Sequence, residues 1–122
     1  MKSITPLLHV QDMVESLAFY QVLGFDLEQR VPEEGPPSWV YLVRGSVHLM
    51  LQETEQRQAD ARLEGDIEQG MVLHMGHGDI VDFYHMLQDV GMPVSDMDPS
   101  GLLEFMIRDP DGYTLVFFLD EG

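Results

Sequence analysis

The chain repeats one set of turn and helix signals at a constant spacing. An Asp that can begin a helix, a Gly that can end one and a turn Gly each recur 67 positions later. The pairs are Asp12 and Asp79, Gly24 and Gly91, and Gly45 and Gly112. Three signals of different kinds at one spacing indicate an internal duplication, which restricts the fold to two copies of one unit.

Each copy predicts a strand, a helix and three further strands. In the first half we expect strands over 3–10, 25–31, 39–43 and 47–52, with a helix over 12–23. In the second half the strands cover 71–76, 102–107 and 114–119, the helix begins at Asp79 and ends before Gly91, and an extended piece at 93–94 completes the set. The unit is therefore βαβββ.

A tight acidic turn precedes the last strand, in the segment RDPDGYTLVFF from Arg108 to Phe118. Pro110 fixes φ near −65° and Gly112 can adopt a positive φ, so both residues suit a hairpin turn. We interpret Asp109–Gly112 as a structural turn that sets the strand register, and not as a catalytic motif.

These elements predict an α+β protein with two tandem βαβββ modules in one domain. The length of 122 residues fits one domain, and 44% hydrophobic residues can build a core. We place the first module at 1–54, a linker at 55–70 and the second module at 71–122. No apolar run reaches the roughly 18 residues of a membrane span, and the N-terminus does not resemble a secretory signal, so a cytoplasmic location is expected.

The formal net charge of −16 constrains the partners. Nucleic-acid affinity comes largely from Lys and Arg on phosphates, so nucleic acid is excluded as a partner. A strongly negative protein attracts cationic ligands over long distances, although the same charge is explained equally well by solubility alone. The chain has no Cys, which excludes disulfides and thiolate metal sites.

Several short segments resemble the glyoxalase/bleomycin-resistance proteins, the vicinal oxygen chelate superfamily. They are Val10-Gln11-Asp12 at the end of a strand, Phe19-Tyr20 within a helix, Leu23-Gly24-Phe25 after it, and RDPDG with the strand that follows. The resemblance implies that each module curls its sheet into half of a cup that holds a ligand or a metal. It also implies a homodimer. Enzymes of the family bind a divalent metal through His, Gln or Glu, whereas metal-free members bind small molecules, including a cationic drug.

The family's metal positions can be transferred to this chain one at a time. The first strand of each module places Thr5 and Val72 there, and the last strand of the second module places Val116. In the first module the corresponding residue is His48, or Met50 if the register shifts by two residues. Valine cannot bind a metal and threonine rarely does, and one histidine does not hold a divalent ion. We therefore expect no cofactor, and keep a divalent metal as the lesser alternative.

Strand alternation places His9, His48 and His74 on the inner face of the predicted cup. His9 occupies a position where some glyoxalases have a substrate-binding Arg. The same face is expected to carry aromatic, Met and small polar residues, with Gln52 near the rim: Trp39, Tyr41, Met50, Met106, Thr114 and Phe118. Such a face suits a flat or hydrophobic ligand, although it also suits an ordinary core. His77 is expected on the opposite face from His74, and His85 on a helix.

Three functions follow from these residues. The first is a metal-free protein that binds or sequesters a small molecule, such as a cationic aromatic drug, through Trp39, Tyr41, His48 and Phe118. The second is a metal-dependent enzyme of the glyoxalase, dioxygenase or epimerase kind. Such an enzyme would use an atypical site built on His9, His48 or His74, with Glu104 as a further candidate. The third is a dimeric interaction module without a small ligand.

Overall fold

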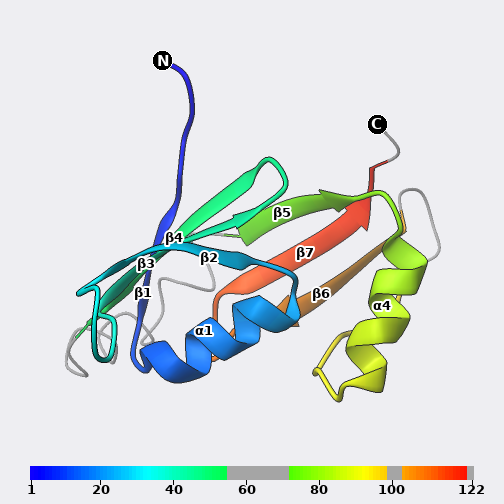
Figure 1. Ribbon diagram of the computed structural model, residues 1–122. Helices are drawn as coiled ribbons and strands as arrows, with labels where there is room; N and C mark the ends of the chain where they lie inside the picture. Colours follow the sequence, from blue (N-terminus) through cyan, green and yellow to red (C-terminus); the bar gives the residue numbers. More distant parts are fainter. Residues whose placement is uncertain (55–71, 99–102, 121–122) are drawn as a thin grey trace. The chain divides into compact units, whose positions relative to one another are not determined.

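The computed structural model describes residues 1–54, 72–98 and 103–120 (Figure 1). The chain divides into two compact units, Met1–Glu64 and Gly65–Gly122. The division agrees with two tandem modules. The linker expected at 55–70 lies outside the described residues. Within the described ranges, no helix is long and apolar enough to span a membrane.

The first module has the predicted strand, helix and three further strands. Its elements are β1 Leu7–Val10, α1 Met13–Val22, β2 Asp26–Val31, β3 Trp39–Arg44 and β4 Val47–Glu53. The strands form a four-stranded sheet in the order β1-β4-β3-β2. β1 runs parallel to β4, because the helical crossover lies between them in the chain, while β2, β3 and β4 form antiparallel hairpins.

The sequence determines both ends of α1. Asp12 is the N-cap, and its Oδ1 accepts a hydrogen bond from the Glu15 N–H at 3.2 Å. Glu53, at the end of β4, accepts a second bond from the Met13 N–H at 2.9 Å. After the helix, Gly24 has φ +102°, a conformation that favours glycine. The helix is thus fixed to the sheet at its start and stopped where the sequence predicts.

One face of the first sheet forms the core. Alternate strand residues on this face are almost completely buried, and α1 and the turn after it add further apolar side chains. The set comprises Leu8, Val10, Val40, Leu42, Leu49, Leu51, Met13, Tyr20, Leu23 and Phe25. In Figure 1, α1 lies along this sheet, so the opposite face carries the second set of alternate residues.

The second module repeats this order of elements, but the strand expected after its helix is reduced to isolated contacts. It contains β5 Val72–His77, α4 Ile80–Asp89, β6 Glu104–Arg108 and β7 Thr114–Leu119, in a sheet of order β5-β7-β6. The extended piece expected at 93–94 is represented by single contacts beside β6. The Ser95 N–H donates to the Met106 carbonyl at 2.8 Å, and Asp98 forms an isolated bridge with Glu104.

The acidic turn between β6 and β7 is confirmed as structural. Asp109 is 5% exposed, and its Oδ1 accepts from the N–H groups of Asp111 at 2.9 Å and Tyr113 at 2.8 Å. Gly112 has φ +90°. Asp109 therefore replaces the hydrogen bonds that the turn backbone cannot make with the ladder.

Two sequence predictions need correction. The first strand begins at Leu7 and not at residue 3, because Pro6 has no N–H to give to a ladder. Asp79 stands at the N-cap of α4, but its side chain makes no capping hydrogen bond. Instead, the Asp79 N–H donates to Nδ1 of His77 at 3.0 Å.

Candidate functional site

The face of the first sheet opposite its core carries the residues predicted for ligand binding. His9, Trp39, Tyr41, His48 and Met50 alternate with the buried residues of β1, β3 and β4. We call these five residues the aromatic face. His9 and His48 are exposed, and the other three are partly exposed. The prediction that they share one face is confirmed, while their role in binding stays a prediction.

Three rings of the aromatic face form a continuous row. The ring centroids of Trp39 and Tyr41 lie 6.3 Å apart, and those of Tyr41 and His48 lie 5.6 Å apart with an edge-on orientation. The Tyr41 hydroxyl lies 2.6 Å from Nδ1 of His48. When Tyr41 donates this bond, neutral His48 carries its proton on Nε2 and can donate from there. The row therefore combines flat apolar surface with a hydrogen-bonding end.

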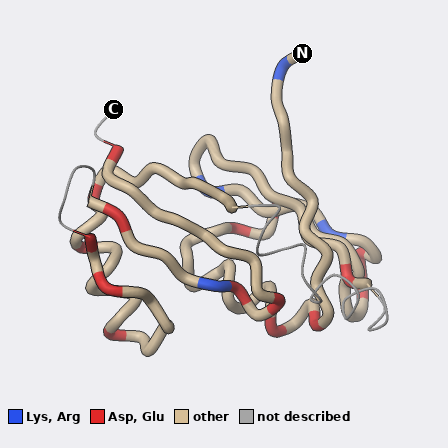
Figure 2. The backbone as a smooth tube through the Cα atoms, turned by 180° about the vertical axis from the view of Figure 1, so that it is seen from behind, with Lys and Arg blue, Asp and Glu red and all other residues tan. Residues whose placement is uncertain are grey.

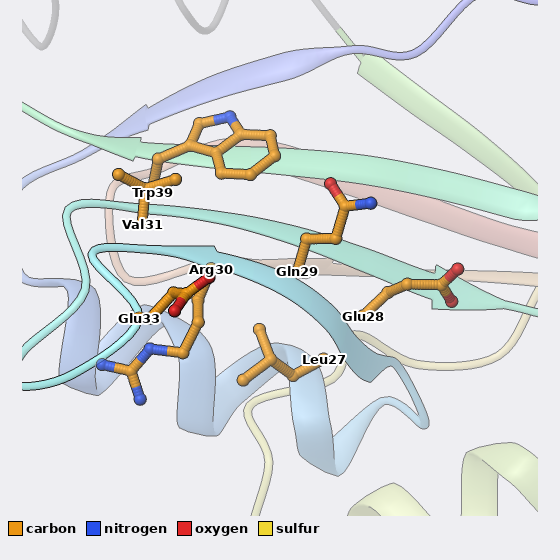
Figure 3. A pocket seen from close by; sticks show the side chains of 7 residues that line it. All are labelled: Leu27, Glu28, Gln29, Arg30, Val31, Glu33 and Trp39. Atoms are coloured by element: carbon orange, nitrogen blue, oxygen red, sulfur yellow. The ribbon is translucent and has the colours of Figure 1, made fainter.

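A pocket adjoins this row at the outer edge of β2 (Figure 3). Its volume is about 530 Å³, and it is lined by Leu27, Glu28, Gln29, Arg30, Val31, Glu33 and Trp39. Among these residues, the sequence pointed only to Trp39. The others lie on an edge strand and the following loop, where alternation alone does not indicate a cavity. A usable signal was the Pro- and Gly-rich loop directly after an edge strand.

The second module has a matching face away from its core. His74, Met106 and Phe118 lie on it, and the rings of His74 and Phe118 are 6.0 Å apart. His77 lies on the opposite side, stacked on Phe83 at 4.4 Å. The predicted faces of these histidines are therefore confirmed. That the faces of both modules line one cup stays a prediction.

The strand register settles the open choice between His48 and Met50. In the first sheet Leu7 pairs with Met50, and in the second sheet His74 pairs with Val116. Leu7 and His74 stand at the same distance before their helices, so Met50 is the counterpart of Val116. Assigning His48 to this position is therefore wrong by two residues.

The reason is the length of the last hairpin loop in each module. Arg44 pairs with Val47 across two loop residues, whereas Arg108 pairs with Thr114 across five. Gly45 and Gly112 share the 67-residue spacing but occupy different places in their loops. Matching Val47-His48-Leu49 to Leu115-Val116-Phe117 by sequence therefore gave a register that differs by two residues from the strand pairing.

The side chains at the family's metal positions do not fit a divalent metal. With the corrected register these positions hold Thr5, Met50, Val72 and Val116, and none supplies an imidazole or a carboxylate. Among the described residues, no group of three or more His, Cys, Asp or Glu side chains is arranged to hold a metal ion.

Negative charge is spread over both modules (Figure 2). In residues 1–54, seven Asp or Glu accompany three Lys or Arg. In the described part of the second module, nine Asp or Glu accompany Arg108 as the single basic residue. Figure 2 shows acidic positions along α4 and at the end of β7. Each module therefore carries a field that favours cations.

Solved structures of similar fold have several different functions. A bleomycin-binding protein complexed with bleomycin has a TM-score of 0.74 and 21% identity, covering 99% of this chain and 100% of that chain. A lactoylglutathione lyase from Agrobacterium tumefaciens has a TM-score of 0.69 and 18% identity, and the match covers 99% of this chain and 96% of that chain. The fosfomycin resistance protein FosX from Mesorhizobium loti has a TM-score of 0.72 and 9% identity, and the match covers 98% of this chain and 93% of that chain. At these identities the similarity shows the fold alone.

The family is shown by sequence as well. No curated protein matches the chain. The model of the Glyoxalase/Bleomycin resistance protein/Dioxygenase superfamily matches residues 3–117. This match covers both modules, and it agrees with the duplicated βαβββ architecture. The chain therefore belongs to the Glyoxalase/Bleomycin resistance protein/Dioxygenase superfamily.

Proposed function

We propose that the chain is a metal-independent protein that binds a small aromatic cation on the aromatic face of its first module. The observation that carries the proposal is the row Trp39–Tyr41–His48, which remains accessible on the face opposite the core. Flat ligands stack on such rings, and a cation gains from the negative faces of Trp and Tyr. The surrounding negative charge supports the same class of ligand.

The residues at the family's metal positions support metal independence. Binding on the aromatic face needs only ring contacts and the hydrogen-bonding groups of His48 and Tyr41, and it moves no proton or electron. The bleomycin-binding neighbour supports the proposal by analogy, because that protein holds a drug on the same fold. A metal-dependent enzyme is the competing function, but no observation in the described residues favours it.

Calorimetric titration with metal-free bleomycin tests the proposal. We expect saturable binding that weakens as salt rises, since screening reduces the attraction between the ligand and the protein. Trp39→Leu removes the ring and should weaken binding at least about tenfold, whereas Trp39→Phe keeps a ring and should weaken it less. Because Trp39 is the single Trp of the chain, its fluorescence reports on this face directly.

Thermal unfolding of EDTA-treated protein tests metal independence separately. Zn²⁺, Ni²⁺, Mn²⁺ and Fe²⁺ are each added, and we expect no change in Tm. An ion that binds the folded state at a hundredfold excess over its Kd stabilises the protein by about 2.7 kcal/mol, which is readily measured. A rise in Tm that disappears in His48→Ala would refute metal independence and favour an enzyme.

A further inference from the structure

The pocket at the outer edge of β2 differs in chemistry from the aromatic face that it adjoins. Figure 3 shows side chains from both sides of β2 around it, together with Glu33 from the following loop and Trp39 from β3. Gln29 and Val31 pair with Tyr41 and Trp39 and so share the side of the aromatic face. Trp39 therefore belongs to both regions, and one ligand can contact both.

The lining of the pocket combines apolar surface with negative charge. Leu27, Val31 and the Trp39 indole supply the apolar part, and Glu28 and Glu33 supply two carboxylates. A β-bulge at Glu28 interrupts the pairing of β2 with β3 between Leu27 and Gln29. Such a bulge redirects side chains at a sheet edge. Carboxylates and an indole in the lining of one pocket are groups that attract an organic cation.

Arg30 is the single basic residue of the lining, and two of its nitrogens are directed at the loop. Its Nε donates to the Pro32 carbonyl at 3.1 Å, and its guanidinium also donates to the Gly35 carbonyl. The loop is closed by a bond of 2.8 Å from the Ser38 N–H to the Val31 carbonyl. Arg30 therefore holds the loop that carries Glu33, and the lining keeps one net negative charge.

The position of β2 adds backbone hydrogen-bonding groups. Within the described first sheet, β2 is an edge strand and pairs with β3. Alternate backbone N–H and C=O groups of an edge strand point outward, away from the sheet. The carbonyl oxygens among them are acceptors for an ammonium or guanidinium group, so the selection of a cation comes from the carboxylates and the indole.

We infer that the β2-edge pocket is the subsite for a pendant cationic group, such as an alkylammonium, on a ligand whose aromatic part lies against the aromatic face. This inference rests on the proposed function, and it narrows the ligand to an aromatic molecule with a basic side arm. Glu28 and Glu33 bind the cation, the Trp39 indole packs against it, and Arg30 is a positioning residue that acts through the loop.

Two probes that share the same ring system distinguish binding in the β2-edge pocket from binding on the aromatic face. The first probe is 4-amino-7-chloroquinoline, and the second is chloroquine, which adds a pendant tertiary ammonium to the same ring. Calorimetry gives the Kd of each probe. We expect chloroquine to bind about tenfold more tightly, the combined effect of two partly solvated ion pairs and one cation–π contact. This preference should fall as salt rises.

The decisive variant is Glu28→Gln with Glu33→Gln, which keeps the side-chain size and removes both charges. We expect it to abolish the preference for chloroquine and to leave the affinity for the plain quinoline unchanged. Glu34→Gln is the matched control, because Glu34 is in the same loop but does not line the pocket, and it should keep the preference. Arg30→Lys should reduce the preference in part, since lysine cannot hold two carbonyls in the same way.

The possible results distinguish failure of the subsite from failure of the proposed function. If the wild type binds both probes equally, or if the double variant keeps the preference, the subsite is refuted and the proposed function stands. If chloroquine binds but the plain ring does not, and the double variant loses chloroquine, the subsite stands and binding on the aromatic face is refuted. If neither probe binds, both statements are overturned for this class of ligand.

Discussion

The buried turn before β7 allows a quantitative test of how the second module is held together. Asp109→Ala removes the carboxylate oxygen that accepts from the N–H groups of Asp111 and Tyr113. Both residues are 4% exposed, so water cannot easily replace the lost acceptor. The substitution therefore leaves two buried donors without this partner.

The expected loss of stability can be estimated from these two bonds. A buried donor without an acceptor costs roughly 1–3 kcal/mol, and partial relaxation of the turn lowers the sum, so we expect about 3 kcal/mol for Asp109→Ala. Asp109→Asn keeps an oxygen in the same place. Since neutral bonds are about half as strong as charge-assisted ones, this variant should lose about 1 kcal/mol.

Far-UV circular dichroism follows the unfolding of both variants, in urea for the free energy of unfolding and on heating for the Tm. The Tm should fall by roughly 10 °C for Asp109→Ala, given about 3–5 °C per kcal/mol for a domain of this size. Asp96→Ala, an exposed acidic residue of the same module, is the control and should change stability by less than about 0.5 kcal/mol. Equal losses for the Ala and Asn variants would refute the assignment of the loss to the two accepted hydrogen bonds.

Two further predictions concern glycine and helix capping. Gly24→Ala should be more destabilising than Gly35→Ala. Both glycines have positive φ, which costs about 1–2 kcal/mol for Ala, but at Gly24 the new Cβ would also lie 2.6 Å from Nε of Arg44, whereas nothing lies within 4 Å at Gly35. Asp12→Ala should cost about 1 kcal/mol by loss of the cap, and Asp79→Ala less than about 0.5 kcal/mol because its side chain caps nothing. Urea unfolding measures all four variants, and equal losses within either pair would contradict the geometry.

Most of the fold was predictable, because helix-capping residues, turn glycines and strand alternation are local signals. Asp12 and Gly24 define α1, and the alternation of β3 and β4 predicted which face is buried. Capping in the second module was not predictable in the same way. Asp79 has the correct residue type and position, but its side chain makes no capping hydrogen bond, and its own N–H donates to Nδ1 of His77. This arrangement depends on how the chain bends before the helix, which the residue types alone do not reveal.

The candidate site was predictable only in its aromatic part. The alternation of residues along β3 and β4 predicted that Trp39, Tyr41 and His48 share one face, and the strand register agrees. Alternation is a local pattern that can be recognised within a single strand. The β2-edge pocket depends on a bulge at Glu28 and on a loop tied down by Arg30. Both are tertiary features, because a bulge is defined by the partner strand and the Arg30 bonds end on loop carbonyls. The residue type and the loop position of Glu33 therefore do not by themselves place it in a pocket.

The error at His48 shows what an internal repeat does and does not preserve. A duplication keeps the elements that build the core, so helix starts and ends remain at one spacing. Hairpin loops tolerate insertions, and the second module has a five-residue loop where the first has two. Side chains near the last strand must therefore be aligned through strand pairing and not through turn glycines. In this alignment Met50 and Val116 occupy equivalent positions in their modules. Neither side chain supplies the nitrogen or oxygen that a divalent metal requires. His48 then belongs with Tyr41 at the end of an aromatic row, where its hydrogen bond suits ligand contact without a metal.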